Sequence, residues 1–154
     1  MTSKTTLVSL IVWLAAGTLC FGSAFDGTWK LNAKKSHVRG GMARNETVYY
    51  GGAFFFRNKV TVDGRDAKGS PTHSEWVGMF NGADFPVTGD PDSDARAYQQ
   101  VDDHTLNVWM KKGGKVVGTG KVVVSPDGKS RTVTIMRPGR HHKMVRTTSV
   151  YDKV

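Results

Sequence analysis

The chain has 154 residues, of which 38% are hydrophobic and 23% charged, and its formal net charge is +9. This length suits one domain, since single domains usually contain about 100–150 residues, and it excludes a multidomain enzyme. The single cysteine excludes a disulfide-stabilised scaffold, and the single long apolar run excludes a polytopic membrane protein. The composition therefore predicts one folded domain with an ordinary hydrophobic core.

The N-terminal segment has the three parts of a secretory signal peptide. Lys4 precedes an apolar run over residues 7–19, and the small residues Gly-Ser-Ala follow at positions 22–24. The run is shorter than the ~20 residues that span a bilayer, and lipid attachment at Cys20 is disfavoured by the large residue before it. We predict a signal peptide over residues 1–24, and a secreted or periplasmic domain without a transmembrane segment over residues 25–154.

From residue 25 onward, short β-rich runs alternate with turn signals such as Asp-Gly, Asn-Gly, Gly-Gly and Pro-Asp-Gly. No long stretch has helical apolar spacing, although the pattern leaves room for one helical turn between Ala33 and Arg44. Regular spacing of strands and turns is typical of an all-β sandwich or barrel. Nine strands are predicted, at residues 25–32, 46–50, 54–62, 72–80, 95–101, 105–111, 116–124, 130–136 and 142–151.

The turn signals also assign side chains to the two faces of the predicted sheet. A two-residue turn at Asp103-His104 places Tyr98 opposite Trp109. A two-residue Gly113-Gly114 turn pairs Lys112 with Lys115 and therefore Trp109 with Gly118, and a three-residue loop from Pro126 places Val122 opposite Thr132. Side chains alternate between faces, and neither face is uniformly apolar, which favours a barrel with a partly polar lumen over a sandwich. The face that contains Tyr98 also carries Arg96, Gln100, Trp109, Gly118, Val122, Val124, Thr132, Thr134 and Met136.

The first predicted strand opens with a Gly-x-Trp motif, Gly27-Thr28-Trp29, which resembles the signature of the calycin barrels, the lipocalins and fatty-acid-binding proteins. The last strand, from Ser149 onward, resembles the closing strand of fatty-acid-binding proteins, and the whole is similar to small secreted bacterial lipocalin-like proteins. The resemblance implies a single antiparallel up-and-down β-barrel of eight to ten strands around a ligand cavity. It also implies that Trp29 plugs one end of that barrel.

The same resemblance bears on the ligand. Fatty-acid-binding proteins hold a carboxylate with two arginines and a tyrosine, and the corresponding positions here are Val122, Ser149 and Tyr151. Only the tyrosine is retained, so the resemblance implies an apolar or amphipathic ligand that is bound without that arginine pair, in a protein that is not an enzyme. Arg96 would be the one lumenal charge available to orient an acidic group. The predicted ligand-binding residues are Arg96, Tyr98, Trp109, Val122, Thr132, Thr134, Ser149 and Tyr151.

A second hypothesis rests on the basic balance of the chain. Arg137, Arg140 and Lys143 gather positive charge at one predicted hairpin. This hairpin would dock on an anionic surface, such as lipid headgroups or a polysaccharide, while side chains fill the barrel. The predicted export argues against nucleic acid as the partner.

No metal site, cofactor or catalytic group is predicted. The five histidines lack the spacing of metal ligands, and the adjacent His141 and His142 would point to opposite faces of a strand. The predicted mature chain has no cysteine and no Gly-x-Ser-x-Gly motif, and its carboxylates form no recognisable catalytic pair. An enzyme is therefore the least favoured of the three classes of function.

Overall fold

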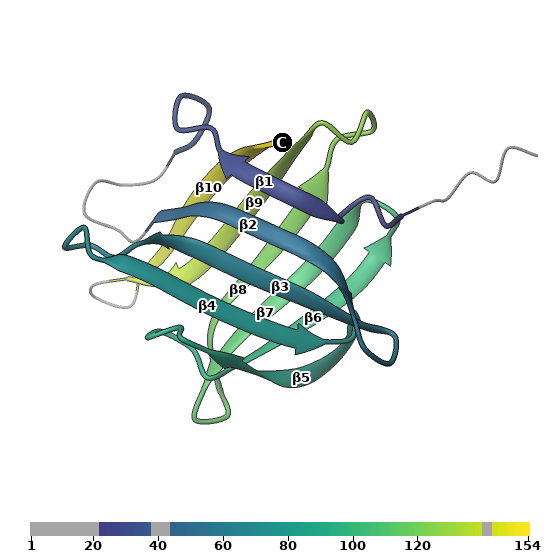
Figure 1. Cartoon of the computed structure of the whole chain (residues 1–154). Coiled ribbons are helices and arrows are strands. Elements are labelled where there is room, and N and C mark those ends of the chain that lie inside the picture. The colour runs from purple at the N-terminus through teal and green to yellow at the C-terminus, as the bar shows by residue number, and fades with distance from the viewer. Residues whose placement is uncertain (1–21, 38–43, 140–142) are drawn as a thin grey trace, which may run out of the picture.

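The structure is a computed structural model that describes residues 22–37, 44–139 and 143–154, and every regular element in these residues is a β-strand. Ten strands form one closed antiparallel barrel, in which consecutive strands pair and β1 pairs with β10 (Figure 1). This confirms the predicted fold class. The strands are β1 (Gly27–Leu31), β2 (Arg44–Ala53), β3 (Arg57–Arg65), β4 (Pro71–Gly78), β5 (Asn81–Thr88), β6 (Ala95–Asp102), β7 (Thr105–Lys112), β8 (Lys115–Val124), β9 (Ser130–Pro138) and β10 (Met144–Lys153).

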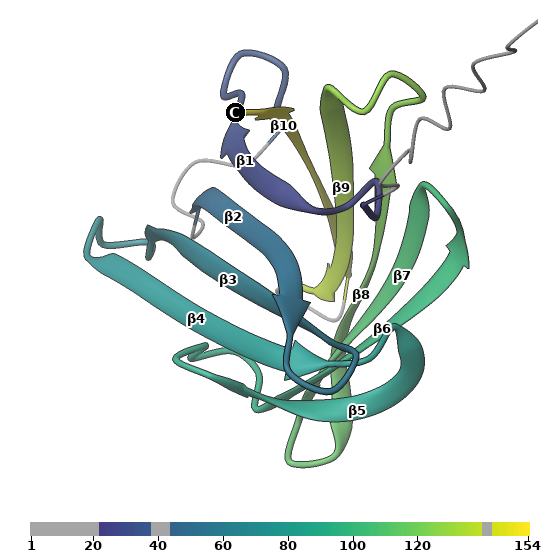
Figure 2. The same cartoon turned by 45° about the vertical axis from the view of Figure 1, so that its right-hand side comes forward.

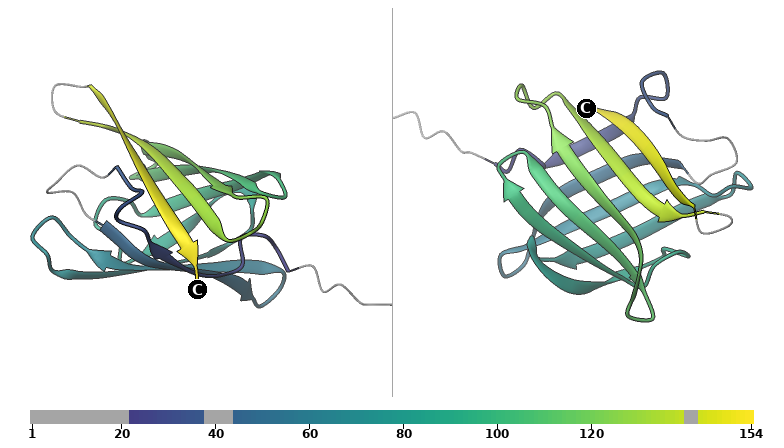
Figure 3. Two further views of the ribbon diagram at one scale, coloured as in Figure 1. Left: turned by 90° about the horizontal axis from the view of Figure 1, so that it is seen from above. Right: turned by 180° about the vertical axis from the view of Figure 1, so that it is seen from behind.

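All odd-numbered strands run in one direction, which gives the barrel two distinct ends. We call the end where these strands begin the floor, and the end where they finish the mouth. Figures 2 and 3 show the strands curling around the interior from three further sides. The described part of the segment between β1 and β2 contains a hydrogen-bonded turn at residues 33–35, and residues 38–43 lie outside the described chain. Across the described residues, no helix has the length and apolar character that crossing a membrane requires.

Strand β5 is the element that the sequence pattern missed. Gly82 and Pro86 interrupt its sequence, and both residue types are unfavourable inside strands. Only two residue pairs, Glu75–Thr88 and Trp76–Val87, join β5 to β4, and a register shift after Asn81 interrupts its pairing with β6. We call the joint between these two strands the β4–β5 seam.

Three consecutive phenylalanines, predicted as the start of a strand, instead form the turn between β2 and β3. Ala53 pairs with Arg57, so Phe54, Phe55 and Phe56 make up the whole loop, which we call the phenylalanine turn. Their exposed fractions are 89%, 88% and 100%. Phe55 and Phe56 both have φ of 58°, whereas every other residue with positive φ in the described chain is a glycine. Left-handed backbone at a non-glycine residue costs roughly 1–2 kcal/mol.

Replacing Phe56 with glycine is therefore expected to stabilise the protein. Relief of the left-handed strain outweighs the added backbone entropy of the unfolded chain, for a net gain of about 0.5–1 kcal/mol. Urea unfolding followed by circular dichroism measures this change. Phe54 is as exposed but has no positive φ, so Phe54→Gly is the matched control and should not stabilise. Equal effects of the two substitutions on stability would contradict the interpretation that backbone strain at Phe56 destabilises the protein.

The hydrophobic core fills the floor side of the barrel. Trp29 is fully buried, and its indole N–H donates a hydrogen bond to the carbonyl oxygen of Phe25 at 2.8 Å. Phe25 packs edge-on against Phe80, and the ring of Trp76 stacks on Phe80 and meets Tyr98 edge-on at a centroid distance of 4.7 Å. These large rings bury much apolar surface and occupy the interior near the floor.

One β-bulge changes the register of β7 against β6. The two-residue turn after Asp102 is present, but Val101 has no partner in β7. The pairing is shifted by one residue beyond it, so Tyr98 pairs with Val108 and the predicted Tyr98–Trp109 pair is wrong. A shift of one residue moves every following side chain to the opposite face of the sheet.

The next two connections shift the register in the same way. Val117 has no partner in β7, so Trp109 pairs with Thr119. The loop between β8 and β9 has four residues, 126–129, instead of the predicted three, so Val122 pairs with Val133. Both predicted pairings are therefore wrong by one residue.

The combined result is that β7 and β9 are turned over relative to the prediction, while β6 and β8 keep their predicted faces. Because side chains alternate between faces along a strand, the observed pairings place other residues of β7 and β9 in the interior than the sequence predicted. That set comprises Leu106, Val108, Met110, Arg131, Val133, Ile135 and Arg137.

Candidate ligand-binding pocket

A pocket of about 220 Å³ lies at the mouth of the barrel. It is lined by the ends of β1, β3 and β9, the beginnings of β2, β4 and β6, the central part of β10, and the loop between β5 and β6. One part of its wall is apolar and is formed by Leu31, Val62, Val133 and Ile135. The rest carries hydroxyl and charged groups, so the pocket has both an apolar and a polar side.

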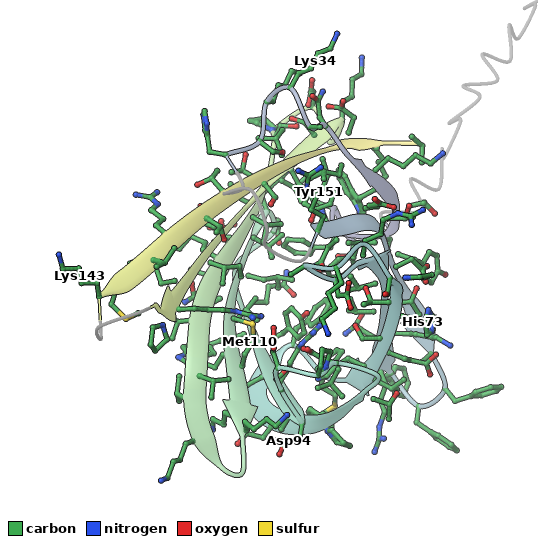
Figure 4. All side chains as sticks on the ribbon, turned by 90° about the vertical axis from the view of Figure 1, so that its left-hand side faces the viewer. Lys34, His73, Asp94, Met110, Lys143 and Tyr151 are labelled. Carbon is green, nitrogen blue, oxygen red and sulfur yellow. The ribbon has the colours of Figure 1, made fainter. Side chains whose placement is uncertain are left out.

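Five of the eight predicted ligand-binding residues lie inside the barrel. Arg96, Ser149 and Tyr151 line the pocket. Tyr98 and Val122 lie in the packed core, where they are 4% and 2% exposed. Figure 4 shows the labelled Tyr151 within the ring of strands. The structure thus brings three of the predicted residues together around one space and packs two others into the core.

The other three predicted residues lie on the outside of the barrel. Trp109 and Thr134 line a shallow groove on the outer face together with Lys121 and Met136. Thr132 lies two residues before Thr134 in β9 and therefore on the same face. The expectation that these three side chains point into the lumen is wrong, because β7 and β9 are turned over.

A buried ion pair forms the polar side of the pocket. The Arg96 guanidinium donates to the Asp90 carboxylate at 2.5 Å, and the Ser93 hydroxyl donates to the same oxygen. The two charged side chains are only 11% and 9% exposed. Burial acts to raise the pKa of Asp90, but the hydrogen bonds from Ser93 and Arg96 and the positive charge of Arg96 lower it below its usual value.

The ion pair leaves one donor of Arg96 unused. Its Nε–H is buried and has no hydrogen-bond partner among the described residues. A buried donor without a partner is unfavourable, and such groups are uncommon in folded proteins. The Arg96 side chain also lines the pocket, where Asp90 neutralises its charge.

Arg137 is a second charged residue of the pocket wall, and the sequence prediction placed it instead at a basic hairpin tip. Its guanidinium donates to the Asp92 carboxylate at 2.7 Å and contacts the sulfur of Met110 at 3.2 Å. Of its two predicted partners in that basic tip, Arg140 lies outside the described residues and Lys143 is exposed and projects from the barrel (Figure 4). The engagement of Arg137 with Asp92 does not favour its use in docking on an anionic surface.

Sequence reasoning missed a buried arginine beneath the pocket. Arg131 is 2% exposed, and its guanidinium carbon lies 5.1, 4.8 and 4.6 Å from the ring centroids of Trp29, Tyr50 and Tyr151. Cation–π contacts with three rings take the place of an acidic partner, and its Nε and Nη1 atoms have no hydrogen-bond partner in the described chain. Burial raises the pKa of Tyr50 and of Tyr151, so both hydroxyls stay protonated near neutral pH.

The described residues contain no group of three His, Cys, Asp or Glu side chains placed to hold a metal ion, and His141 and His142 lie outside them. No protein-family model matches the chain, and no curated protein matches it. The pocket itself has an apolar wall and a polar side whose charges neutralise one another. Such a lining suits the reversible binding of a small molecule with one polar end.

Proposed function

We propose that the protein is a secreted or periplasmic, lipocalin-like carrier that binds a small amphipathic molecule in the mouth pocket without transforming it. The observation that carries the proposal is the combination of an apolar wall with the guanidinium of Arg96, whose charge Asp90 neutralises, around one space of about 220 Å³. Pockets for drug-sized ligands typically enclose about 300–1,000 Å³. The ligand is therefore small.

The polarity of the lining defines how the ligand lies. Its apolar part packs against Val62, Val133 and Ile135, and its polar end accepts a hydrogen bond from Arg96. Because the charge of Arg96 is already balanced by Asp90, the acceptor need not be anionic. A carbonyl or hydroxyl oxygen satisfies the donor, and a carboxylate would bring an additional uncompensated negative charge into the pocket.

The proposed export is compatible with the start of the folded chain. Gly22 and Ser23 are exposed, whereas Phe25 is fully buried under the barrel. Cleavage after Ala24 would leave Phe25 and all ten strands in the mature protein. This supports the proposal of a signal peptide over residues 1–24 and of one domain over residues 25–154.

The pocket is tested by filling it with a side chain. Thr147 lines the pocket, whereas its neighbour Arg146 is exposed on the outer face. Thr147→Phe is expected to weaken the binding of a neutral amphipathic fluorescent probe with a carbonyl acceptor, 6-propionyl-2-dimethylaminonaphthalene, by about tenfold or more, since a tenfold change needs only ~1.4 kcal/mol. The matched substitution Arg146→Phe should leave the dissociation constant unchanged. Fluorescence titration measures both.

Native mass spectrometry of the protein purified from its own host provides the second readout. The spectrum should contain the protein with a bound small molecule, and that added mass should be absent from the Thr147→Phe variant. A wild-type chain that shows only its own mass, together with probe binding that is equal in the two variants, would contradict the proposed carrier.

A further inference from the structure

The phenylalanine turn lies at the floor, at the opposite end of the barrel from the mouth pocket. We propose that this turn is a membrane-insertion element, which places the rings of Phe54, Phe55 and Phe56 in the apolar layer at the surface of a lipid bilayer. The inference is independent of the ligand in the pocket. It assigns a second binding activity to the other end of the molecule.

The first argument is that the turn does not need phenylalanine for its shape. Other turns of the barrel that require left-handed backbone use glycine, as at Gly69, Gly114 and Gly128. Phe55 and Phe56 adopt the same backbone region in spite of their large side chains. The backbone strain at these two residues persists although their rings are almost completely exposed. The turn therefore needs the phenylalanine rings themselves, because glycine would give the same backbone shape without strain.

The second argument is the arrangement of residues behind the tip. Tyr49 is 42% exposed, and its hydroxyl lies over Gly51, so its side chain extends along β2 toward the turn. Arg57 directly follows the three phenylalanines, and its guanidinium lies 5.8 Å from the centroid of the Phe85 ring. No ion pair of Arg57 with an acidic side chain occurs in the described chain.

This order of side chains matches the layers of a bilayer surface. Apolar rings occupy the tip, and an amphipathic tyrosine and an unpaired cation follow at the depth of the headgroups, where such residues concentrate in membrane-bound proteins. The guanidinium of Arg57 is complementary to a lipid phosphate. A bilayer also accepts a convex tip of three exposed rings without needing a concave surface of matching shape. A bilayer is therefore the occupant that the geometry favours.

The test compares vesicle binding of the wild type with that of a variant whose turn is polar. In Phe54→Ser/Phe55→Asn/Phe56→Gly, the residues at positions 55 and 56 tolerate positive φ, so this variant should fold at least as well as the wild type. Its matched control is Val116→Ser/Met144→Ser, which removes two apolar side chains that are 52% and 55% exposed at the mouth. Circular dichroism verifies the fold of all three proteins.

The probes are vesicles of phosphatidylcholine and vesicles of phosphatidylcholine with phosphatidylglycerol, used in co-sedimentation. The wild type and the control should bind both, and the polar-turn variant should bind with a partition coefficient at least tenfold lower. Binding to phosphatidylcholine should persist at high salt, because it rests on apolar contact. In the Phe55→Trp variant, the fluorescence emission of the introduced tryptophan should shift to shorter wavelength when vesicles are added. Lipids brominated in their acyl chains should quench this emission.

Three results would overturn the proposal. The wild type fails to sediment with either vesicle, or the polar-turn variant binds as well as the wild type. The third is a dimer of the wild type that forms without vesicles and is lost in the polar-turn variant, which would assign the turn to a second copy of this chain. If the wild type and the polar-turn variant bind equally well, only to anionic vesicles and only at low salt, the proposal is also overturned. That outcome would favour the basic hairpin as the binding element.

Discussion

Replacing Trp29 with alanine is expected to lower the free energy of unfolding by about 3–5 kcal/mol, the usual loss for a buried tryptophan. The side chain is fully buried, and the substitution also removes the hydrogen bond from its indole to Phe25. It further deprives Arg131 of one of the three rings that surround its charge. Urea unfolding monitored by circular dichroism measures the change. In a domain whose total stability is of order 5–15 kcal/mol, such a loss is large.

The matched control is the same substitution at Trp109, whose indole borders the shallow groove on the outer face. Trp109 is only partly buried, so Trp109→Ala should lower the stability by about 1–2 kcal/mol, clearly less than Trp29→Ala, because less apolar surface is lost. The pair therefore also tests the corrected orientation of β7. Comparable losses at the two positions would be incompatible with an outward-facing Trp109.

Replacing Asp90 with alanine is expected to lower the free energy of unfolding by about 3–5 kcal/mol, since removing one member of a buried ion pair leaves the other charge without compensation. Arg96 is only 11% exposed, and Ser93, which is 1% exposed, would lose the acceptor of its hydroxyl. The double substitution Asp90→Ala/Arg96→Met removes both charges and should cost clearly less than Asp90→Ala alone. A larger loss in the double variant would refute the ion pair as the cause.

The same pair makes the stability depend on pH in a defined direction. The native pKa of Asp90 is lowered from its ordinary value of 3.8. Its contribution is thus fully present above the pKa of the unfolded carboxyl group and is lost as the pH falls through the lower native pKa. The difference in stability between the wild type and Asp90→Asn should be constant near neutral pH and shrink below about pH 4. Unfolding curves recorded from pH 7 downward measure this difference.

The barrel could be predicted because residues with special backbone preferences mark most of its turns. The two-residue Gly113–Gly114 turn and the pairing of Lys112 with Lys115 occur as the sequence predicts. Strand β5 lacks such a signal, since Gly82 and Pro86 are typical of loops, and its place depends on pairing with β6. The phenylalanine turn was missed for the opposite reason, because phenylalanine favours strands.

The candidate site could be predicted only in part, and the reason is the bulges. Val101 and Val117 are ordinary strand residues, so nothing in the sequence marks them as skipped positions. One skipped residue reverses a whole strand, which is why Trp109 was assigned to the lumen and Arg131 was not. Arg96 was assigned correctly because β6 kept its predicted face, whereas its partner Asp90 lies in a loop whose position depends on the closed barrel.

The β4–β5 seam determines where the barrel opens first during partial unfolding. Only the residue pairs Glu75–Thr88 and Trp76–Val87 join these two strands, whereas β9 and β10, and β2 and β3, are paired along most of their length. Local opening begins where the fewest backbone hydrogen bonds must break. Opening at this seam would convert the barrel into an open sheet with two unpaired edge strands, β4 and β5, which could pair with a strand of another molecule. The polar residues Asn81 and Asp84 and the proline at position 86 on one of those edge strands oppose such pairing.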